Sequence, residues 1–377
     1  MAQKKDEKTG KWYYYGSYVD EFNKRIQYKK RGYNTKREAI RAEESFRMDV
    51  ESHKIPTSNY TMSNLIDDFL DHYITQNKAS SYQSNKQVYA KIKASIGHIK
   101  LSKLNATILQ SYINDLDKKY SKRYVEKIYY CINKALNYGI DKNKIINNPL
   151  KKVYRDTRKN ELKKEMNFWE PYQFQKFISR VDDKMYYTLF SFLYYMGCRK
   201  GEALALQWND IDLNNSTVNI RKTVTFKVAN NPWLITPPKT GNSIRIITMP
   251  SKLKNIMVEW KNIQKNIYGF DLTRYVFGFT RPLAPENVRR HFNDGITKAN
   301  TNDDGTPINE SDQIPKIRIH DLRHSHASYL INNKSDMFTD FDIAKRLGDT
   351  VQTLHETYAH WFHGADKNII DFMDQDI

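Results

Sequence analysis

The sequence predicts a multidomain α+β fold, with a small β module and helix, a helical bundle, and a mixed domain that is mainly α. The first observation is length, because 377 residues exceed one ordinary hydrophobic core and favour two or three domains. The second is that the spacing of apolar residues changes from strand-like to helical near residue 61. The third is a return to mixed strand and helix patterns after residue 166. The predicted domains are residues 1–55, 61–145 and 166–377.

The net charge of +18 and the pI near 9.5 indicate a polyanionic partner. The positive excess lies in the middle of the chain, since residues 61–160 carry 19 basic and 8 acidic side chains whereas residues 161–377 carry 28 and 26. Cys131 and Cys198 lack CxxC spacing, which argues against a disulfide scaffold or a structural zinc site and fits a reducing cytosol. No signal-like N-terminus and no apolar run of about eighteen residues occurs, so we expect a soluble intracellular protein.

Residues 1–55 predict a β hairpin followed by a helix. Aromatic and β-branched runs at 11–19 and 24–31 are separated by a polar turn. Thr35 and Glu38 have capping-box spacing at the start of the helix. Basic side chains crowd the second run, and we expect them to contact a DNA major groove: Lys24, Arg25, Lys29, Lys30 and Arg31. The alternative is a solvated edge strand whose charges prevent aggregation.

Residues 61–145 predict a compact bundle of four helices. Apolar residues recur at three- and four-residue intervals in four segments, at 62–75, 81–96, 105–116 and 122–138. The polar faces are rich in basic side chains that can bind a phosphate backbone, among them Lys86, Lys91, Lys93, Lys122 and Arg123. The alternative is that these lysines only cover the surface. Residues 141–165 contain Pro149 and many charges without periodicity, and we interpret them as a basic linker.

The first half of residues 166–377 contains helical patterns at 170–179 and 185–195 and strand patterns at 216–226, 233–236 and 244–249. Arg199 stands at a turn into a short helix, and Glu202 can orient its guanidinium group, although the pair can also be an ordinary surface ion pair. Lys239 lies in the predicted turn between the last two strands. Its flexible stem can reach a leaving oxygen as a general acid, or it is simply solvated.

Residues 317–361 combine two cationic side chains with a late tyrosine. His320 and Arg323 are three residues apart at the start of an apolar-periodic run, so on a helix they point the same way and can hold one anion. Tyr358 follows between polar neighbours, where a purely structural tyrosine is less expected. His324 and His326 are expected to pack or to form hydrogen bonds within the helix.

Four motifs carry a resemblance to a known family. They are GCRKGEAL at 197–204, TPPKTGNSIR at 236–245, HDLRHSHAS at 320–328, and RLGD at 346–349 with TYAH at 357–360. In this order and spacing the chain resembles the tyrosine recombinases, specifically the integrases of phages and other mobile elements. The resemblance covers almost the whole chain and is strongest after Met166. It implies a three-stranded arm-site DNA-binding module, a SAM-like core-binding domain, and a catalytic domain of the tyrosine recombinase type with a C-terminal tail helix.

The resemblance implies a transesterification without metal or cofactor. Tyr358 would attack a DNA phosphate and become joined to its 3′ side, Arg199 and Arg323 would hold the two non-bridging oxygens, His320 would assist proton transfer at the nucleophile, and Lys239 would protonate the departing 5′ oxygen. The implied function is integration and excision of a mobile element, such as a viral genome, through a covalent 3′-phosphotyrosine intermediate. The alternatives are a DNA-binding relative that does not cut, or strand relaxation like that of a type IB topoisomerase.

One position departs from the family pattern. Members usually have His or Trp nine residues before the nucleophile, and this chain has Asp349. A carboxylate facing a phosphate would repel it unless protonated or turned away. We therefore expect Asp349 to accept a hydrogen bond and orient another donor, a lysine or a histidine.

The resemblance also implies partners. These are double-stranded DNA at attachment sites, three further copies of the chain in a homotetramer, a host DNA-bending protein and an excisionase, with the protein acting in the cytoplasm on the nucleoid and not at a membrane. The stretch 364–377 has an amphipathic pattern, which we interpret as a tail helix that docks on a neighbouring subunit.

Overall fold

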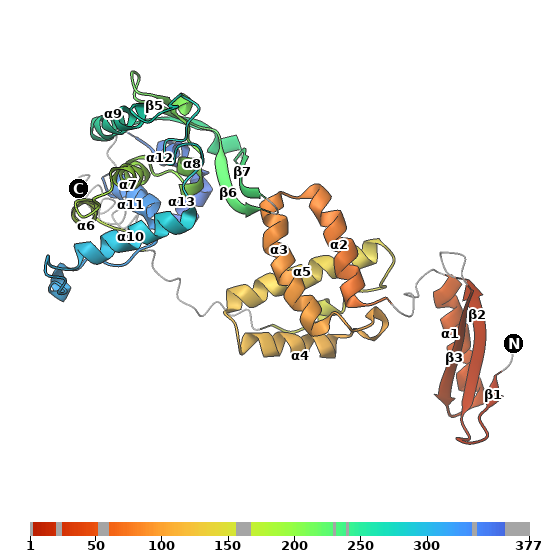
Figure 1. The fold of residues 1–377 in the computed structure, drawn as a ribbon. Coiled ribbons are helices and arrows are strands. Elements are labelled where there is room, and N and C mark those ends of the chain that lie inside the picture. The colour runs from red at the N-terminus through yellow and green to blue at the C-terminus, as the bar shows by residue number, and fades with distance from the viewer. Residues whose placement is uncertain are drawn as a thin grey trace, which may run out of the picture. The chain divides into compact units, whose positions relative to one another are not determined.

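A computed structural model describes residues 3–19, 25–51, 60–155, 167–228, 231–238, 241–333 and 338–358. The chain divides into two units, residues 1–159 and 160–377 (Figure 1). Within the described residues, no helix is long and apolar enough to cross a membrane.

The N-terminal part of the first unit is an antiparallel three-stranded sheet covered by one helix. Its elements are β1 (Lys4–Lys5), β2 (Trp12–Val19), β3 (Arg25–Tyr33) and α1 (Lys36–Glu51), with strand order β1-β2-β3. Tyr14 and Tyr28 point from the sheet toward α1, where the rings of Tyr28 and Phe46 lie 4.5 Å apart. Because side chains alternate along a strand, Lys29 and Arg31 project from the opposite face. The predicted hairpin and helix are confirmed.

The rest of the first unit is a helical bundle with its own core. The helices are α2 (Met62–Gln76), α3 (Ala79–Ile96), α4 (Ala106–Asp117) and α5 (Lys122–Asp141), with 3-10 turns η1 (Leu101–Lys103) and η2 (Pro149–Lys152). Their apolar stripes are buried together, as the periodicity predicts. Residues 141–155, which we interpreted as the start of a linker, instead pack on the bundle, since Leu150 and Val153 belong to its core. The remainder of the predicted linker, 156–165, lies outside the described residues.

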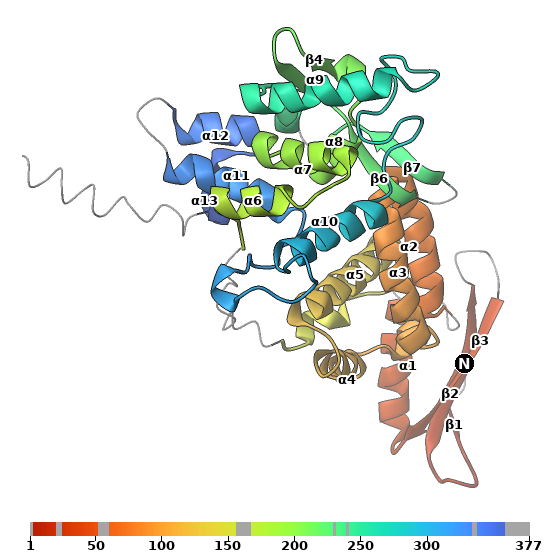
Figure 2. The same ribbon diagram turned by 60° about the vertical axis from the view of Figure 1, so that its left-hand side comes forward.

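The second unit mixes helices with two small sheets. Its helices are α6 (Pro171–Ile178), α7 (Lys184–Met196), α8 (Lys200–Leu204), α9 (Ser251–Lys265), α10 (Pro285–Ala299), α11 (Asp321–Asn332), α12 (Asp340–Leu347) and α13 (Val351–Tyr358), with 3-10 turns η3 (Trp208–Asp210), η4 (Gly241–Ser243) and η5 (Glu310–Asp312). Its strands are β4 (Ile211–Asp212), β5 (Thr217–Ile220), β6 (Thr223–Val228), β7 (Asn231–Thr236) and β8 (Arg245–Thr248). Helices α7 and α11 pack side by side near the centre of this unit (Figure 2).

The strand predictions for this unit are correct in position and wrong in pairing. The run 216–226 is two strands, because Arg221 and Lys222 leave the ladder and bind the buried carboxylate of Asp210 at 3.1 and 2.7 Å. Strand β5 pairs with β4 and β8, whereas β6 pairs with β7. Strands β7 and β8, which we expected to be joined by a turn, therefore belong to two different sheets.

Candidate active site

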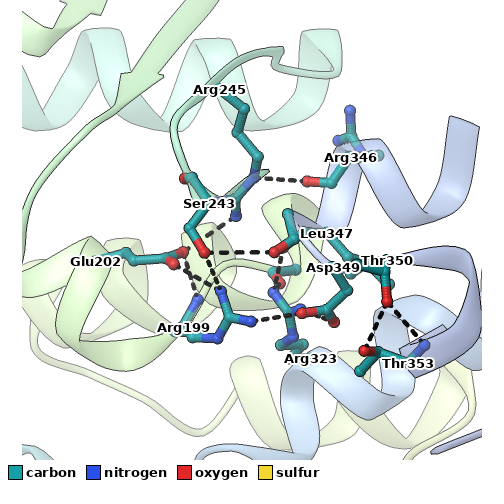
Figure 3. A network of polar contacts seen from close by, with 12 residues as sticks. Arg199, Glu202, Ser243, Arg245, Arg323, Arg346, Leu347, Asp349, Thr350 and Thr353 are labelled. Atoms are coloured by element: carbon teal, nitrogen blue, oxygen red, sulfur yellow. Dashed lines mark hydrogen bonds and ion pairs between the residues drawn. The ribbon is translucent and has the colours of Figure 1, made fainter. Parts of the chain in front are cut away.

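Four separate chain segments supply the side chains of one polar network in the second unit (Figure 3). Helix α7 is capped by Gly197, whose φ of 61° is in the left-handed region, and α8 begins directly after Arg199. A Cβ atom at Gly197 would lie 2.4 Å from the ring of His326, so a larger residue does not fit this turn. The tight turn brings the Arg199 side chain into the network.

Glu202 is the buried carboxylate that organises one side of the network. It accepts hydrogen bonds from the backbone N–H of Arg199 at 3.0 Å, from Arg199 Nη1 at 3.0 Å, and from Arg245 Nη2 at 3.1 Å. Its exposure is 2%. These contacts fix the direction of both guanidinium groups, since a buried carboxylate with paired oxygens has no freedom to turn.

Asp349 joins the two predicted phosphate-binding arginines. Arg199 Nη2 donates to Asp349 Oδ1 at 2.5 Å, and Arg323 Nη2 donates to Asp349 Oδ2. Asp349 thus accepts hydrogen bonds and orients donors as expected, but the donors are two arginines where a lysine or a histidine was expected. Gly348 ends α12 with a φ of 72° and turns the chain so that Asp349 faces inward (Figure 3).

Arg323 is held from several directions and is almost completely buried. Its Nη1 donates to the carbonyl oxygens of Gly197 at 2.9 Å and Leu347 at 2.7 Å, and its exposure is 3%. The guanidinium groups of Arg199, Arg245 and Arg323 face the carboxylates of Glu202 and Asp349, so this part of the network carries a net positive charge. Such an arrangement favours binding of a further anion.

Tyr358 ends α13 and is buried, although its sequence neighbours are polar. Its exposure is 2%, and it packs in a cluster that includes Ala327, Leu347 and Leu354. Burial raises the pKa of the Tyr358 phenol to about 12, and the positive charge of Arg323 acts in the opposite direction. His324 Nδ1 lies 3.0 Å from Tyr358 Oη.

His320 is the N-cap of α11 and has helical backbone angles, so its i to i+3 relation to Arg323 continues the geometry of the helix. Its ring is 5.1 Å from the ring of His324 and approximately perpendicular to it. Loss of surrounding water and the nearby charge of Arg323 lower the pKa of the His320 imidazole. His320 is therefore more often neutral near pH 7 than a free histidine.

Some predicted site residues lie outside the described residues. These are Lys239, Lys24 and the tail helix. The chemistry expected of Lys239 therefore remains a prediction.

The predicted DNA-binding side chains of the β module are divided between two faces of the sheet. Lys29 Nζ lies 4.4 Å from the centre of the Tyr13 ring, and Arg31 lies 5.8 Å from the same ring. Arg25 alternates onto this face as well. Lys30 points to the other face, near Phe46 of α1. The face that can meet a duplex thus consists of Arg25, Lys29 and Arg31 with tyrosine rings between them.

The basic side chains of the bundle differ in their contacts: an ion pair, an aromatic ring, or solvent. Lys93 forms an ion pair with Asp67 at 2.6 Å, which neutralises it locally. Lys91 lies over the rings of Tyr120 and Tyr124, and Lys86 lies over Tyr82. Lys122 and Arg123 are exposed at the start of α5.

Arg245 and His324 belong to the site but are not among the site residues predicted from the sequence. Arg245 is the last residue of the motif at 236–245 and the first residue of β8, so its place in that motif was a usable signal. His324 directly follows Arg323, and Asp321 lies three residues before it; both positions were signals that His324 could belong to the site. Neither pattern shows by itself which side chain the residue will meet.

Comparison with protein-family models gives three matches along the chain. The model of the phage integrase family matches residues 155–362, more than half of the chain. An arm DNA-binding domain matches residues 2–49, and the N-terminal SAM-like domain of phage integrases matches residues 61–116.

Curated relatives are similar over most of their length. The ICEBs1 integrase of Bacillus subtilis (strain 168) is 27% identical over 356 residues, which cover 90% of this chain and 90% of that protein. The integrase of Staphylococcus phage L54a is 25% identical over 339 residues, or 82% of this chain and 91% of that protein.

Solved structures share the fold at low identity. The Tn1549 transposon integrase in complex with a circular intermediate DNA has a TM-score of 0.67 and 16% identity, covering 83% of this chain and 99% of that chain. A lambda integrase dimer bound to a COC′ core site has a TM-score of 0.56 and 14% identity, covering 93% of each chain.

Proposed function

Because this chain belongs to the phage integrase family and is a tyrosine-type site-specific recombinase, we propose that it cuts and rejoins DNA through a covalent bond between Tyr358 and a 3′ phosphate. The reaction integrates and excises a mobile element. It needs no external energy source, because the phosphotyrosine ester conserves the energy of the broken phosphodiester bond for the second strand transfer.

The observation that carries this proposal is the convergence of Arg199 and Arg323 on one anionic group. Arg199 donates to one oxygen of the Asp349 carboxylate and Arg323 to the other. The positive charge of Arg323 also lowers the pKa of the buried Tyr358 phenol, against the effect of burial. The two non-bridging oxygens of a phosphodiester likewise share one negative charge. Two fixed guanidinium groups can therefore hold the non-bridging oxygens of a phosphate and stabilise the charge that develops on attack.

Asp349 is a positioning residue in this scheme. It keeps the two guanidinium groups aimed at one point, and the DNA phosphate takes the place of its carboxylate when the duplex binds. The exchange of one anion for another preserves the charge balance around Arg323, which is too buried to remain unpaired without cost.

The remaining roles belong to residues at the edge of the network. His320 donates a hydrogen bond to the bound phosphate or moves a proton beside it, and Lys239 protonates the departing 5′ oxygen. Glu202 holds Arg199 in place through the contacts described above.

We propose that the protein acts on attachment sites as a homotetramer, in the cytoplasm on the nucleoid. The support is that a lambda integrase tetramer is bound to a Holliday junction in a solved structure of the same fold. A host DNA-bending protein and an excisionase complete the proposed set of partners. Arg25, Lys29 and Arg31 of the β module and Lys86, Lys91, Lys122 and Arg123 of the bundle are the proposed contacts with the phosphate backbone and grooves.

The test is a covalent adduct. The element's junction is first mapped by sequencing, and a nicked duplex of that junction is incubated with the purified protein. We expect a protein–DNA band that survives denaturation and is absent with Tyr358→Phe. No band with the parent protein would support a relative that binds without cutting, whereas relaxation of supercoiled plasmid that lacks the junction would support topoisomerase-like activity.

A further inference from the structure

We propose that His324 is the catalytic base for Tyr358, accepting the phenolic proton on Nδ1 as the tyrosine oxygen attacks phosphorus. This inference rests on the proposed function of Tyr358 as the nucleophile. It gives a catalytic role to His324, in addition to the roles at the phosphate that are proposed for Arg199, Arg323, His320 and Lys239.

The first support is the geometry of the pair. His324 lies on α11 and Tyr358 at the end of α13, and His324 Nδ1 is 3.0 Å from Tyr358 Oη. The two ring centres are 5.5 Å apart with planes at 69°. Both side chains are buried, with exposures of 7% and 2%. A base at hydrogen-bond distance from the reacting atom, in a site shielded from water, meets the geometric requirement for proton transfer.

The second support is the neighbour on the far side of the ring. Asp321 Oδ1 lies 3.9 Å from His324 Nε2, and Arg318 donates hydrogen bonds to this carboxylate, so it is held in place. A negative charge beside Nε2 favours the tautomer that carries its proton there. That tautomer leaves Nδ1 as an acceptor directed at the tyrosine hydroxyl.

The charged surroundings keep His324 in its neutral, basic form. The titratable and charged groups that act on the ring are His320, Asp321, Arg323 and Arg318 from its own segment, and Tyr358 from α13. Burial and the positive neighbours lower the pKa of His324 to about 4. The ring is therefore neutral and can accept a hydrogen bond throughout the neutral range, but its low pKa makes it a weak base, so the proton has to move in concert with attack on phosphorus.

The step is balanced when the proton moves together with bond formation. The bond from phosphorus to Tyr358 Oη forms, the bond from phosphorus to the 5′ oxygen breaks, and that oxygen takes a proton from the general acid assigned to Lys239. The phenolic proton passes to His324 Nδ1. On religation the new 5′ hydroxyl attacks phosphorus and returns its proton to Lys239, while the protonated His324 returns its proton to the leaving tyrosine oxygen.

The proposal separates two histidines that lie close together. His320 is the more exposed residue of the two, whereas His324 is buried against the tyrosine. We assign the phosphate side to His320 and the nucleophile to His324.

The experiment uses the full-length protein and the nicked duplex of the mapped junction. His324→Asn keeps a polar atom near the position of Nδ1 but cannot accept a proton at neutral pH. Its matched control is His355→Asn, since His355 lies on α13 but contacts Asp340 at 2.9 Å. Single-turnover cleavage is measured from pH 6 to 9, and thermal melts check that both variants fold.

We expect His324→Asn to cleave about 100-fold or more slowly at pH 7, the loss typical of a removed general base. Its residual rate should rise about tenfold per pH unit, because the phenolate must then form without a base, whereas the parent and His355→Asn stay nearly flat. A duplex with a 5′-bridging sulfur has a leaving group that needs no proton. This duplex should restore the cleavage rate of Lys239→Ala and should not restore the cleavage rate of His324→Asn.

Two results would overturn the proposal while leaving the proposed function intact. One is a His324→Asn rate within about threefold of the parent protein at every pH. The other is a slower rate with the parent's flat pH profile, which would indicate that His324 only packs against the tyrosine. If the parent protein itself forms no adduct, the proposed function fails first, and the role of His324 fails with it.

Discussion

Replacing Asp349 with asparagine tests the central feature of the network, because the change removes the negative charge from between Arg199 and Arg323 and keeps the side-chain shape. The Asp349 side chain is 12% exposed and that of Arg323 is 4% exposed, whereas that of Arg199 is 38% exposed. A charge-assisted hydrogen bond contributes about 1.5–3 kcal/mol, and the contact with Arg199 is discounted because water screens it. Without added anion, we therefore expect Asp349→Asn to lower the free energy of unfolding by about 2–3 kcal/mol, or Tm by about 4–12 °C.

Inorganic phosphate should then behave differently on the two proteins. In Asp349→Asn the guanidinium pair lacks its internal anion, so phosphate binds there and stabilises the folded state by about 2.7 kcal/mol at 100 times its Kd. In the parent protein phosphate must displace Asp349, so its effect at the same concentration should be much smaller. Denaturant unfolding followed by tryptophan fluorescence reports on this unit, whose core contains Trp169, Trp208 and Trp260.

The matched control removes an equal charge from the surface. Asp303→Asn breaks the exposed pair between Asp303 and Arg180, and we expect a change within about 0.5 kcal/mol and no added response to phosphate. Sodium chloride of equal ionic strength separates phosphate binding from screening. Equal stabilisation of the parent and Asp349→Asn by phosphate would refute the reasoning, as would an Asp349→Asn protein of unchanged stability without phosphate.

Three further predictions follow from particular contacts. Gly197→Ala should destabilise the second unit by about 2–4 kcal/mol in thermal or denaturant unfolding, because it combines a left-handed φ with a clash against the His326 ring. Replacing Lys29 and Arg31 together with alanine should reduce the slope of log K for DNA against log salt by about 2, whereas Lys93→Ala, already paired with Asp67, should change it less. Burial lowers the pKa of His326 to about 3, so the unfolded chain binds more protons below pH 6.5. The contribution of His326 to the free energy of unfolding should therefore fall by about 2 kcal/mol from pH 7 to pH 5. His326→Gln should lose this contribution, so thermal melts at pH 7 and pH 5 should differ less for the variant than for the parent protein.

Local sequence signals predicted the elements of this fold well because the responsible interactions are themselves local. The apolar spacing in 62–75 and 122–138 is the face of a helix, and α2 and α5 occupy nearly those residues. The prediction that the basic residues of β3 act as one group overlooks the alternation of side chains along the strand, which places Lys30 on the other face from Lys29 and Arg31. The pairing of β5 with β8 could not be predicted in this way. The β6–β7 hairpin lies between these strands in the sequence, and nothing in either strand identifies so distant a partner.

The sequence by itself determined which residues were candidates for the site, through the order and spacing of Arg199, Arg323 and Tyr358 among their motifs. Only the tertiary structure decided what each candidate meets, since Arg199 and Asp349 are 150 positions apart. The physical reason is clearest in α11, where residues 321–328 are all buried despite an aspartate, an arginine and two histidines among them. Buried polar groups require partners, and packing against neighbouring segments supplies them, so Arg323 meets Asp349 and His324 meets Tyr358.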